Sequence, residues 1–286
     1  SAGTLGSTTN SLSVSAGTAN LGYTTQTING GVTLTNNGTI QNGTIISSGG
    51  YNISSGTITT SLQGTGGLTL TGGTLLLSGY DSYSGATNIS SGTLQTTSNY
   101  VLSTSSAFTI ASGATLDLGG YSQQVGSIAG AGTITNSVNS SVTLTTGYDN
   151  TSTTFSGIIQ NGTGPVTFTK TGSGTLTLSG INTYTGGTNV SSGTLTISGS
   201  GTLGANTNTL TVSSGTLNLG TTTQTINGGL TLSSSGTISN GTLSSTATFN
   251  LQGGTVSAVL SGTGGVTSSS STTTLSGANT YSGNTT

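Results

Sequence analysis

An internal repeat constrains this chain more than any other feature of its sequence. The stretch at residues 172–197 recurs, whole or in part, in two other places, and each copy holds a tyrosine at the same point: Tyr83, Tyr184 and Tyr281. These tyrosines lie 184 − 83 = 101 and 281 − 184 = 97 residues apart, a period of about 99 residues. A fixed period indicates a repeat architecture before any local pattern is considered. We therefore expect long repeats at approximately 1–99, 100–198 and 199–286.

The first and third repeats align without a gap. Thr24–Gly31 matches Thr222–Gly229, a separation of 222 − 24 = 198 residues, or two long repeats. The register holds as far as Asn88, whose counterpart is Thr286. We therefore expect the third repeat to be truncated, as in an excerpt from a longer protein.

A shorter period lies inside the long one. A glycine, a threonine and an aliphatic residue follow one another at Gly174, Gly193, Gly215, Gly236 and Gly254, with spacings of 19, 22, 21 and 18 residues. A sandwich or barrel does not require successive strands to share a motif at a constant spacing, whereas stacked coils do. The pattern predicts a single continuous right-handed parallel β-helix, a β-solenoid, with about 14 coils of about 20 residues.

Alternation of large apolar and small polar residues predicts which side chains face inward. This period of two is typical of strands, and no segment shows a helical period, so the predicted class is all-β. The expected interior residues are Leu34, Leu70, Leu116, Leu176, Leu195, Leu217, Leu219 and Ile238. Paired glycines predict the tight corners, at Gly30-Gly31, Gly66-Gly67, Gly186-Gly187 and Gly228-Gly229. The least regular segment, residues 136–164, is expected to leave the rod as a loop.

Composition excludes several classes of protein. Hydrophobic residues make up 29% of the chain and alternate regularly, unlike a flexible Gly/Ser linker. No apolar run is long enough for a transmembrane helix, and no basic cluster points to nucleic acid. A first residue of Ser1 fits a processed, secreted protein or an excerpt. We expect an extracellular or outer cell-surface location.

Candidate catalytic and metal-binding groups are few. The formally charged side chains are Asp81, Asp117, Asp149 and Lys170, and the chain has no His, Cys or Glu. A catalytic triad, a zinc site and a general base near neutral pH all lack their usual residues. Asp81 takes the place of Asn182 and Asn279, and Asp117 that of Asn20 and Asn218. We interpret both as turn residues and predict no catalytic, cofactor-binding or metal-binding residue, no cofactor, and no enzymatic activity.

Several other motifs allow both a structural and a functional interpretation. Gly64–Gly67 and Gly172–Gly174 could cradle a phosphate, but neither opens a helix. The Asn-x-Ser/Thr sequons are no more frequent than this composition gives by chance. Tyr83, Tyr184 and Tyr281 could form an exposed row that binds glycans, although packing over glycine-rich corners is favoured. Thr-x-Thr pairs could bind ice, although threonine is also an ordinary outward strand residue; these pairs are Thr33/Thr35, Thr69/Thr71 and Thr175/Thr177.

Two stretches resemble a known family. Thr154–Gln160 followed by Lys170–Thr188 resembles the passenger-associated repeat of bacterial autotransporters. Leu116–Gly120 with Gly126–Ile134 resembles the segment that follows this repeat. The resemblance implies a right-handed β-helix that is exported across a Gram-negative outer membrane, with a repeat associated with secretion rather than ligand chemistry. The charge content is lower than the family leads us to expect, which suggests a fragment or a specialised filament subunit.

The sequence therefore favours a non-enzymatic structural protein of the cell surface. We expect rods that join other copies, head-to-tail at exposed strand edges, into fibres or an adhesive biofilm layer. The main alternative is the spacer stalk of an autotransporter adhesin. An ice-binding solenoid and a β-helix that binds or cleaves polysaccharide are further alternatives, the last being the least favoured.

Overall fold

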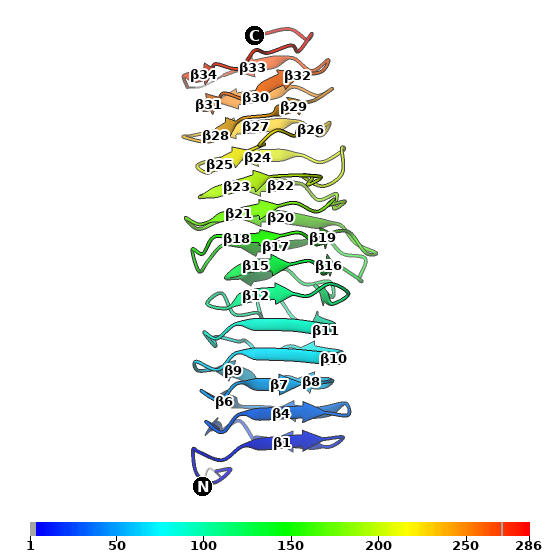
Figure 1. Ribbon diagram of the computed structural model, residues 1–286, viewed down its shortest axis with the longest axis vertical. Helices are drawn as coiled ribbons and strands as arrows, with labels where there is room; N and C mark the ends of the chain where they lie inside the picture. The colour runs from blue at the N-terminus through cyan, green and yellow to red at the C-terminus, as the bar shows by residue number, and fades with distance from the viewer. Residues whose placement is uncertain (1–3, 270) are drawn as a thin grey trace.

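The chain winds into one long column of stacked coils with its two ends at opposite ends of the column (Figure 1). This is a computed structural model, which describes residues 4–269 and 271–286. Every helix or strand element in these residues is a β-strand, and every strand pair is parallel, as in β1 with β4 and β31 with β34. The all-β class and the β-solenoid of about 14 coils predicted from the repeat spacing are confirmed.

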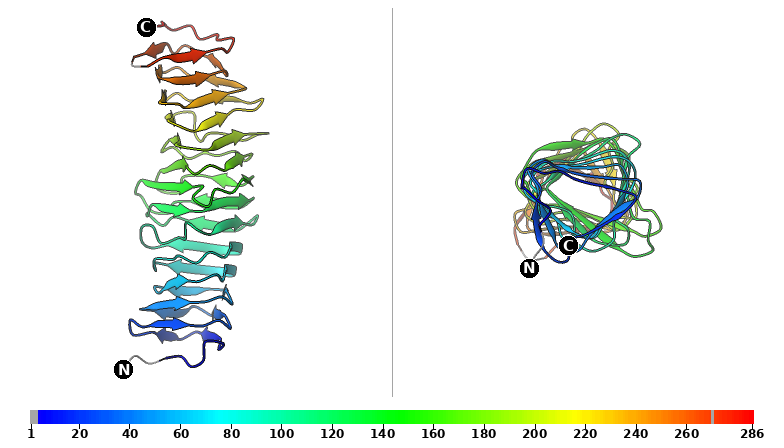
Figure 2. Two further views of the ribbon diagram at one scale, coloured as in Figure 1. Left: turned by 90° about the vertical axis from the view of Figure 1, so that its left-hand side faces the viewer. Right: turned by 90° about the horizontal axis from the view of Figure 1, so that it is seen from below.

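Three ladders of strands run along the column, and the end-on view shows the three-sided coil (Figure 2). We call them ladders I, II and III. Ladder I is unbroken from one end to the other: β1 (Leu12–Ser15), β4 (Val32–Thr35), β7 (Tyr51–Ile53), β10 (Leu68–Leu77), β11 (Thr87–Thr96), β12 (Ala107–Ile110), β15 (Ser127–Gly130), β18 (Thr153–Phe155), β21 (Thr175–Leu178), β23 (Thr194–Ile197), β25 (Thr216–Asn218), β28 (Thr237–Ser239), β31 (Gly254–Val256) and β34 (Thr273–Leu275).

Ladders II and III complete each coil. Ladder II holds the second halves of β10 and β11 together with β2 (Thr18–Asn20), β5 (Gly38–Gln41), β8 (Gly56–Ile58), β13 (Thr115–Asp117), β16 (Thr133–Thr135) and β19 (Ile158–Ile159). A separate sheet of β26 (Thr223–Thr225), β29 (Thr242–Ser244) and β32 (Val259–Ser261) continues it, linked through residues 182–183 and 202–203, which lie outside the strands. Ladder III begins with the sheet of β3 (Thr25–Thr27), β6 (Thr44–Ile46) and β9 (Ser61–Gln63), which residues 81–82 and 101 link to the next sheet. That sheet holds β14 (Gln123–Val125), β17 (Val142–Thr146), β20 (Val166–Lys170), β22 (Thr188–Val190), β24 (Leu210–Val212), β27 (Leu230–Ser233), β30 (Phe249–Gln252) and β33 (Val266–Ser268).

Alternation along each strand fills the interior with aliphatic side chains in register. Leu176, Leu195, Leu217 and Ile238 lie directly above one another in ladder I, and each is buried. The other interior residues predicted from alternation are buried as well. Each such side chain contributes roughly 1.5–3 kcal/mol on burial, so a column of like residues is strongly favoured. The period-two pattern is therefore the direct cause of the core.

Residues 136–164, which we expected to form a loop outside the rod, contain the strands β17, β18 and β19. β17 and β18 each pair with a strand of the coil before and a strand of the coil after, and β19 pairs with β16 of the coil before it. The extra residues lengthen the coils instead: Gly130 pairs with Phe155 and Phe155 with Leu178, so these coils span 155 − 130 = 25 and 178 − 155 = 23 residues. The irregular sequence reflects longer corners within the solenoid, because its few apolar residues still alternate.

These long coils change the phase of the sequence repeat. Leu75 and Leu77 of the first repeat pair with β8 in ladder II. Their counterparts Leu176 and Leu178 lie in β21 of ladder I. The third repeat keeps the phase of the second, since Thr274 of β34 is also in ladder I. The second repeat is therefore turned by one face of the coil relative to the first, although the two sequences align.

Candidate functional site

The charged side chains lie on different coils and serve local structure. Asp117 ends β13; its Oδ1 accepts hydrogen bonds from the backbone N–H groups of Gly119 (2.9 Å) and Ser137 (3.0 Å), and its Oδ2 accepts one from Gln95 Nε2 (2.7 Å). Burial alone would raise the pKa of Asp117, but the hydrogen bonds from Ser137, Gly119 and Gln95 outweigh it and lower the pKa. Asp117 thus stays ionised and holds a turn, as its exchange with Asn suggested.

Asp149 and Lys170 are also tied to nearby groups. Asp149 Oδ2 accepts a hydrogen bond from Ser127 Oγ at 2.7 Å, and its Oδ1 accepts one from the N–H of Thr151 at 3.0 Å. The ammonium of Lys170 donates to the backbone oxygens of Thr171 (2.5 Å) and Gly172 (3.1 Å). Burial lowers the pKa of Lys170, while the charge of Asp149 acts in the opposite direction.

The inward position of Lys170 was missed from the sequence. Its side chain is 1% exposed and lies in register with Thr146 on the preceding coil and Val190 on the following one. The signal was available, because Val166, Phe168 and Lys170 alternate along β20 in the same way as any inward-facing triplet. The ammonium reaches back to corner carbonyls, so the charge is hydrogen-bonded rather than free in the core.

Asp81 is the second deeply buried charged residue. It is 3% exposed and follows β10 at a corner, where its Oδ1 accepts a hydrogen bond from the N–H of Leu62 at 2.8 Å. The sequence suggested a turn residue, but did not indicate burial. Asp81 and Lys170 are both buried, on different coils, and do not form a common surface site. Among the described residues, no group of three or more His, Cys, Asp or Glu side chains could hold a metal ion.

The repeat tyrosines do not form an exposed row. Tyr83 and Tyr184 are completely buried, and each ring packs against an aromatic ring of the preceding coil: Tyr83 on Tyr51 at 5.9 Å and Tyr184 on Phe168 at 6.0 Å between centroids. Tyr281 is partly buried and packs on Phe249 at 6.4 Å. The glycan-binding row is therefore wrong for Tyr83 and Tyr184, because their rings fill the interior rather than face solvent.

Each repeat tyrosine is anchored through its hydroxyl. The Oη atoms of Tyr83, Tyr184 and Tyr281 lie 2.7, 2.6 and 2.9 Å from the Oγ1 atoms of Thr87, Thr188 and Thr285, four residues further on. Thr188 in turn donates to the backbone oxygen of Leu203 on the next coil at 3.2 Å. The Tyr-x-x-x-Thr spacing thus links the buried ring of Tyr184 to the coil above, which gives this motif of the long repeat a structural role.

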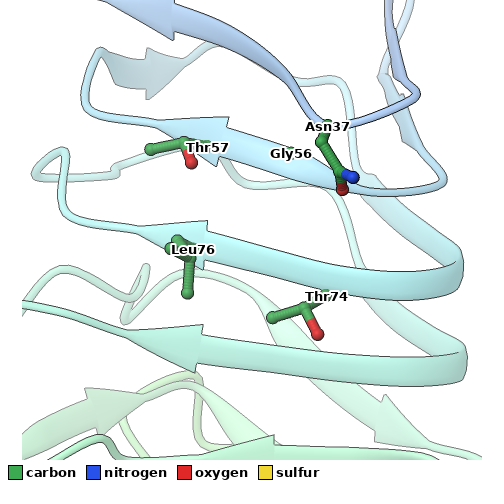
Figure 3. Close-up of a pocket in the computed structure, with 5 residues that line it drawn as sticks. All are labelled: Asn37, Gly56, Thr57, Thr74 and Leu76. Carbon is green, nitrogen blue, oxygen red and sulfur yellow. The ribbon is translucent and has the colours of Figure 1, made fainter. Parts of the chain in front are cut away.

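A shallow pocket lies on the outer side of ladder II in the first repeat (Figure 3). Its volume is about 240 Å³, and it is lined by Asn37, Gly56, Thr57, Thr74 and Leu76. The lining has no ionisable group, and the close-up shows the side chains spread along three successive coils rather than pointing at a common centre. The pocket therefore offers hydroxyl and amide groups for hydrogen bonding, but its lining has no side-chain acid or base.

Threonines form a continuous outward row on ladder I. Thr175, Thr194, Thr216, Thr237, Thr255 and Thr274 follow one another in register on six successive coils. Of the pairs considered from the sequence, Thr175/Thr177 belongs to this face, whereas Thr33 and Thr69 both face Asn52 on the coil between them. A regular hydroxyl row therefore exists in the second and third repeats, but Thr33 and Thr69 do not form one.

Comparison with known proteins agrees with the resemblance to the passenger-associated repeat. Three segments, at 62–96, 168–197 and 268–286, match the family model described as passenger-associated-transport-repeat. No curated protein and no solved structure matches the chain significantly. No helix within residues 4–269 and 271–286 is long and apolar enough to cross a membrane.

The matched segments share one local structure. In the first segment, the single strand β10, whose register shifts near Thr71, precedes the buried Tyr83; in the second, β20 and β21 precede the buried Tyr184. The third segment reaches Tyr281 through β34. The chain is therefore a β-solenoid in which three segments match the passenger-associated-transport-repeat model.

Proposed function

We propose that this protein is a non-enzymatic structural rod, secreted or displayed on the outer surface of a bacterial cell, whose copies associate into fibres or an adhesive layer. The observation that carries the proposal is the unbroken ladder I, which links all coils by parallel backbone hydrogen bonds. The charged groups that chemistry would need are used instead to tie neighbouring coils and turns.

The composition of the surface supports association. The formal net charge is −2 over 286 residues, so copies repel one another weakly in comparison with ordinary soluble proteins. Outward positions are filled mainly by Ser, Thr and Asn, which can hydrogen-bond to a like surface. Flat, regular faces of neutral polar residues allow many equal contacts along the sides of two rods, and strand edges allow contacts at the ends.

Electron microscopy of the 286-residue chain over a range of concentrations tests the proposal. We expect rods that associate into fibres or bundles as concentration rises. Lysines at two outward positions of ladder I, Thr196→Lys and Thr237→Lys, separate side contacts from end contacts, because they add like charges along one side and leave the interior unchanged. Loss of bundles in this variant indicates side-by-side association, and retention of linear fibres indicates end contacts. Isolated rods of the unmodified chain at every concentration would contradict self-association.

A spacer stalk is the alternative that such isolated rods would favour. A stalk needs only length and stiffness, both of which the stacked coils supply, and no contact between copies. Deleting two complete coils from the rod should then shorten the molecule without loss of solubility or secretion. A decrease in secretion instead would tie the repeat itself to export.

The threonine row favours a second candidate, ice binding. The hydroxyl and methyl groups of Thr175 to Thr274 repeat along the rod at roughly the 4.8 Å spacing of parallel strands. Regular rows of this kind can order water in a lattice. Thermal hysteresis of the unmodified chain, and its loss in Thr196→Lys with Thr237→Lys, would support this function; ice crystals that grow as in buffer would exclude it.

A further inference from the structure

The buried carboxyl of Asp81 lies between two neighbouring coils. Its Oδ1 accepts a hydrogen bond from the N–H of Leu62 on the coil before (2.8 Å), and its backbone N–H donates to the carbonyl of Val101 on the coil after (2.9 Å). The second carboxyl oxygen, Oδ2, is buried and has no hydrogen-bond partner. A buried polar oxygen without a partner is costly, and an ionised one much more so.

The counterpart of Asp81 in the second repeat shows what this position requires. Asn182 Oδ1 accepts from the N–H of Ile159 at 2.9 Å, the same contact that Asp81 makes with Leu62. Its Nδ2 then donates to the backbone oxygens of Gly180 (3.2 Å) and Thr202 (2.8 Å). The place that Nδ2 occupies in Asn182 is that of Oδ2 in Asp81. A protonated carboxyl can donate one hydrogen bond from this place, whereas a carboxylate can donate none.

In the third repeat, the side chain at this position accepts the same hydrogen bond. Asn279 Oδ1 accepts from the N–H of Leu260 at 2.8 Å. Two of the three copies thus carry an amide, and the first carries a group whose donor depends on pH.

The groups that face Asp81 do not neutralise its charge. The nearest titratable groups are Tyr51 on β7 and Tyr83 two residues on, whose rings pack against each other. Tyr51 Oη donates to the backbone oxygen of Gln63 at 2.6 Å, and Tyr83 Oη bonds to Thr87 Oγ1. Lys170, the only basic side chain in the sequence, is hydrogen-bonded to its own corner. Burial accordingly raises the pKa of Asp81 well above its usual range, and the bond from Leu62 opposes this only in part.

We propose that Asp81 is a proton-dependent lock between the coils of β9, β10 and β11, closed when its carboxyl is protonated and loosened when the carboxyl ionises. The buried oxygen of Asp81 has no partner, and an amide takes the place of the carboxyl in both other repeats. The proposal does not depend on the assembly or on the function proposed above.

The direction of the pH dependence follows from the raised pKa. An exposed aspartate in the unfolded chain has a pKa of about 3.9. Below that pH both states hold the proton and the lock is fully closed. Above it the folded state holds one proton more than the open state, so the equilibrium constant for opening rises about tenfold per pH unit until the pKa of the folded state is reached. Stability around Asp81 is therefore highest in acid and is lost as pH rises.

Hydrogen exchange followed by mass spectrometry tests the lock in the intact chain. Peptides covering residues 60–84 and their counterparts at 157–184 are compared from pH 4 to pH 8, after correction for the intrinsic pH dependence of exchange. We expect the first segment to lose protection as pH rises and the second to remain protected. In Asp81→Asn, the first segment should become as independent of pH as the second.

The reciprocal substitution guards against a general effect of pH. Asn182→Asp places the same carboxyl in the second repeat and should transfer the pH-dependent loss of protection to residues 157–184, without changing residues 60–84. Equal pH profiles of the unmodified chain and Asp81→Asn would overturn the proposal. So would an Asn182→Asp variant that remains equally protected at pH 4 and pH 8.

Discussion

Tyr184→Ala provides a direct test of how the repeat motif stabilises the rod. Tyr184 is fully buried, packs on Phe168 and anchors Thr188. Removing a large buried aromatic side chain costs about 3–5 kcal/mol of unfolding free energy, because its contacts are lost and a cavity remains. The ring pair with Phe168 accounts for about 0.5–1.5 kcal/mol of this loss. We expect the variant to lose several kcal/mol.

Tyr184→Phe separates the hydroxyl from the ring. The change removes only the hydrogen bond to Thr188 Oγ1, and Thr188 still donates to the backbone oxygen of Leu203. No buried polar group then lacks a partner, so the loss should lie at about 0.5–1.5 kcal/mol. The Phe variant should thus retain most of the stability that the Ala variant loses.

Urea unfolding and local hydrogen exchange measure the two losses together. Coils of a solenoid contact only their neighbours, so the effect should be concentrated in residues 168–208. Tyr80→Ala is the matched control, because Tyr80 is 68% exposed and its loss should change stability by no more than about 0.5 kcal/mol. If Tyr184→Ala cost no more than Tyr80→Ala, or Tyr184→Phe as much as Tyr184→Ala, packing in the interior would not be what the motif provides.

Two further predictions concern the corners. Gly180→Ala should destabilise the rod by at least about 1–3 kcal/mol, because a Cβ there would lie 1.9 Å from the backbone oxygen of Gly157. Thermal unfolding measures this loss of stability, and an unchanged unfolding midpoint would contradict the prediction. The lowered pKa of Asp117 stabilises the fold above about pH 4, and this stabilisation disappears as pH falls. Asp117→Asn should therefore lose less stability in acid than the unmodified chain. Unfolding midpoints that fall equally in the variant and the unmodified chain between pH 6 and pH 2 would refute the prediction.

The period of the sequence was sufficient to predict the class of fold. Leu176, Leu195 and Leu217 alternate with threonine at a constant coil length, so both their burial and their stacking follow from spacing alone. That the chain has no catalytic residue set stays a prediction from composition; the structure shows that Asp117 and Lys170 are hydrogen-bonded to nearby groups.

Two features could not be predicted because they depend on contacts between coils. Asp81 and Asn182 align in sequence, yet only the neighbouring backbone shows that one oxygen of Asp81 has no donor or acceptor to meet. The segment 136–164 was predicted to leave the rod because it is the least regular stretch of the sequence. Its strands remain in the ladders, since strand pairing tolerates a longer corner as long as inward residues such as Leu144 and Phe155 keep their alternation.

The turn of the second repeat by one face has a consequence for any partner that recognises the sequence motif from outside. Matching positions in the second and third repeats lie along one side of the column, while those of the first repeat open onto another side. A flat surface laid against the rod can therefore engage two copies of the motif at once but not three. A partner that wraps around the column, or two partners that approach from different sides, could reach them all.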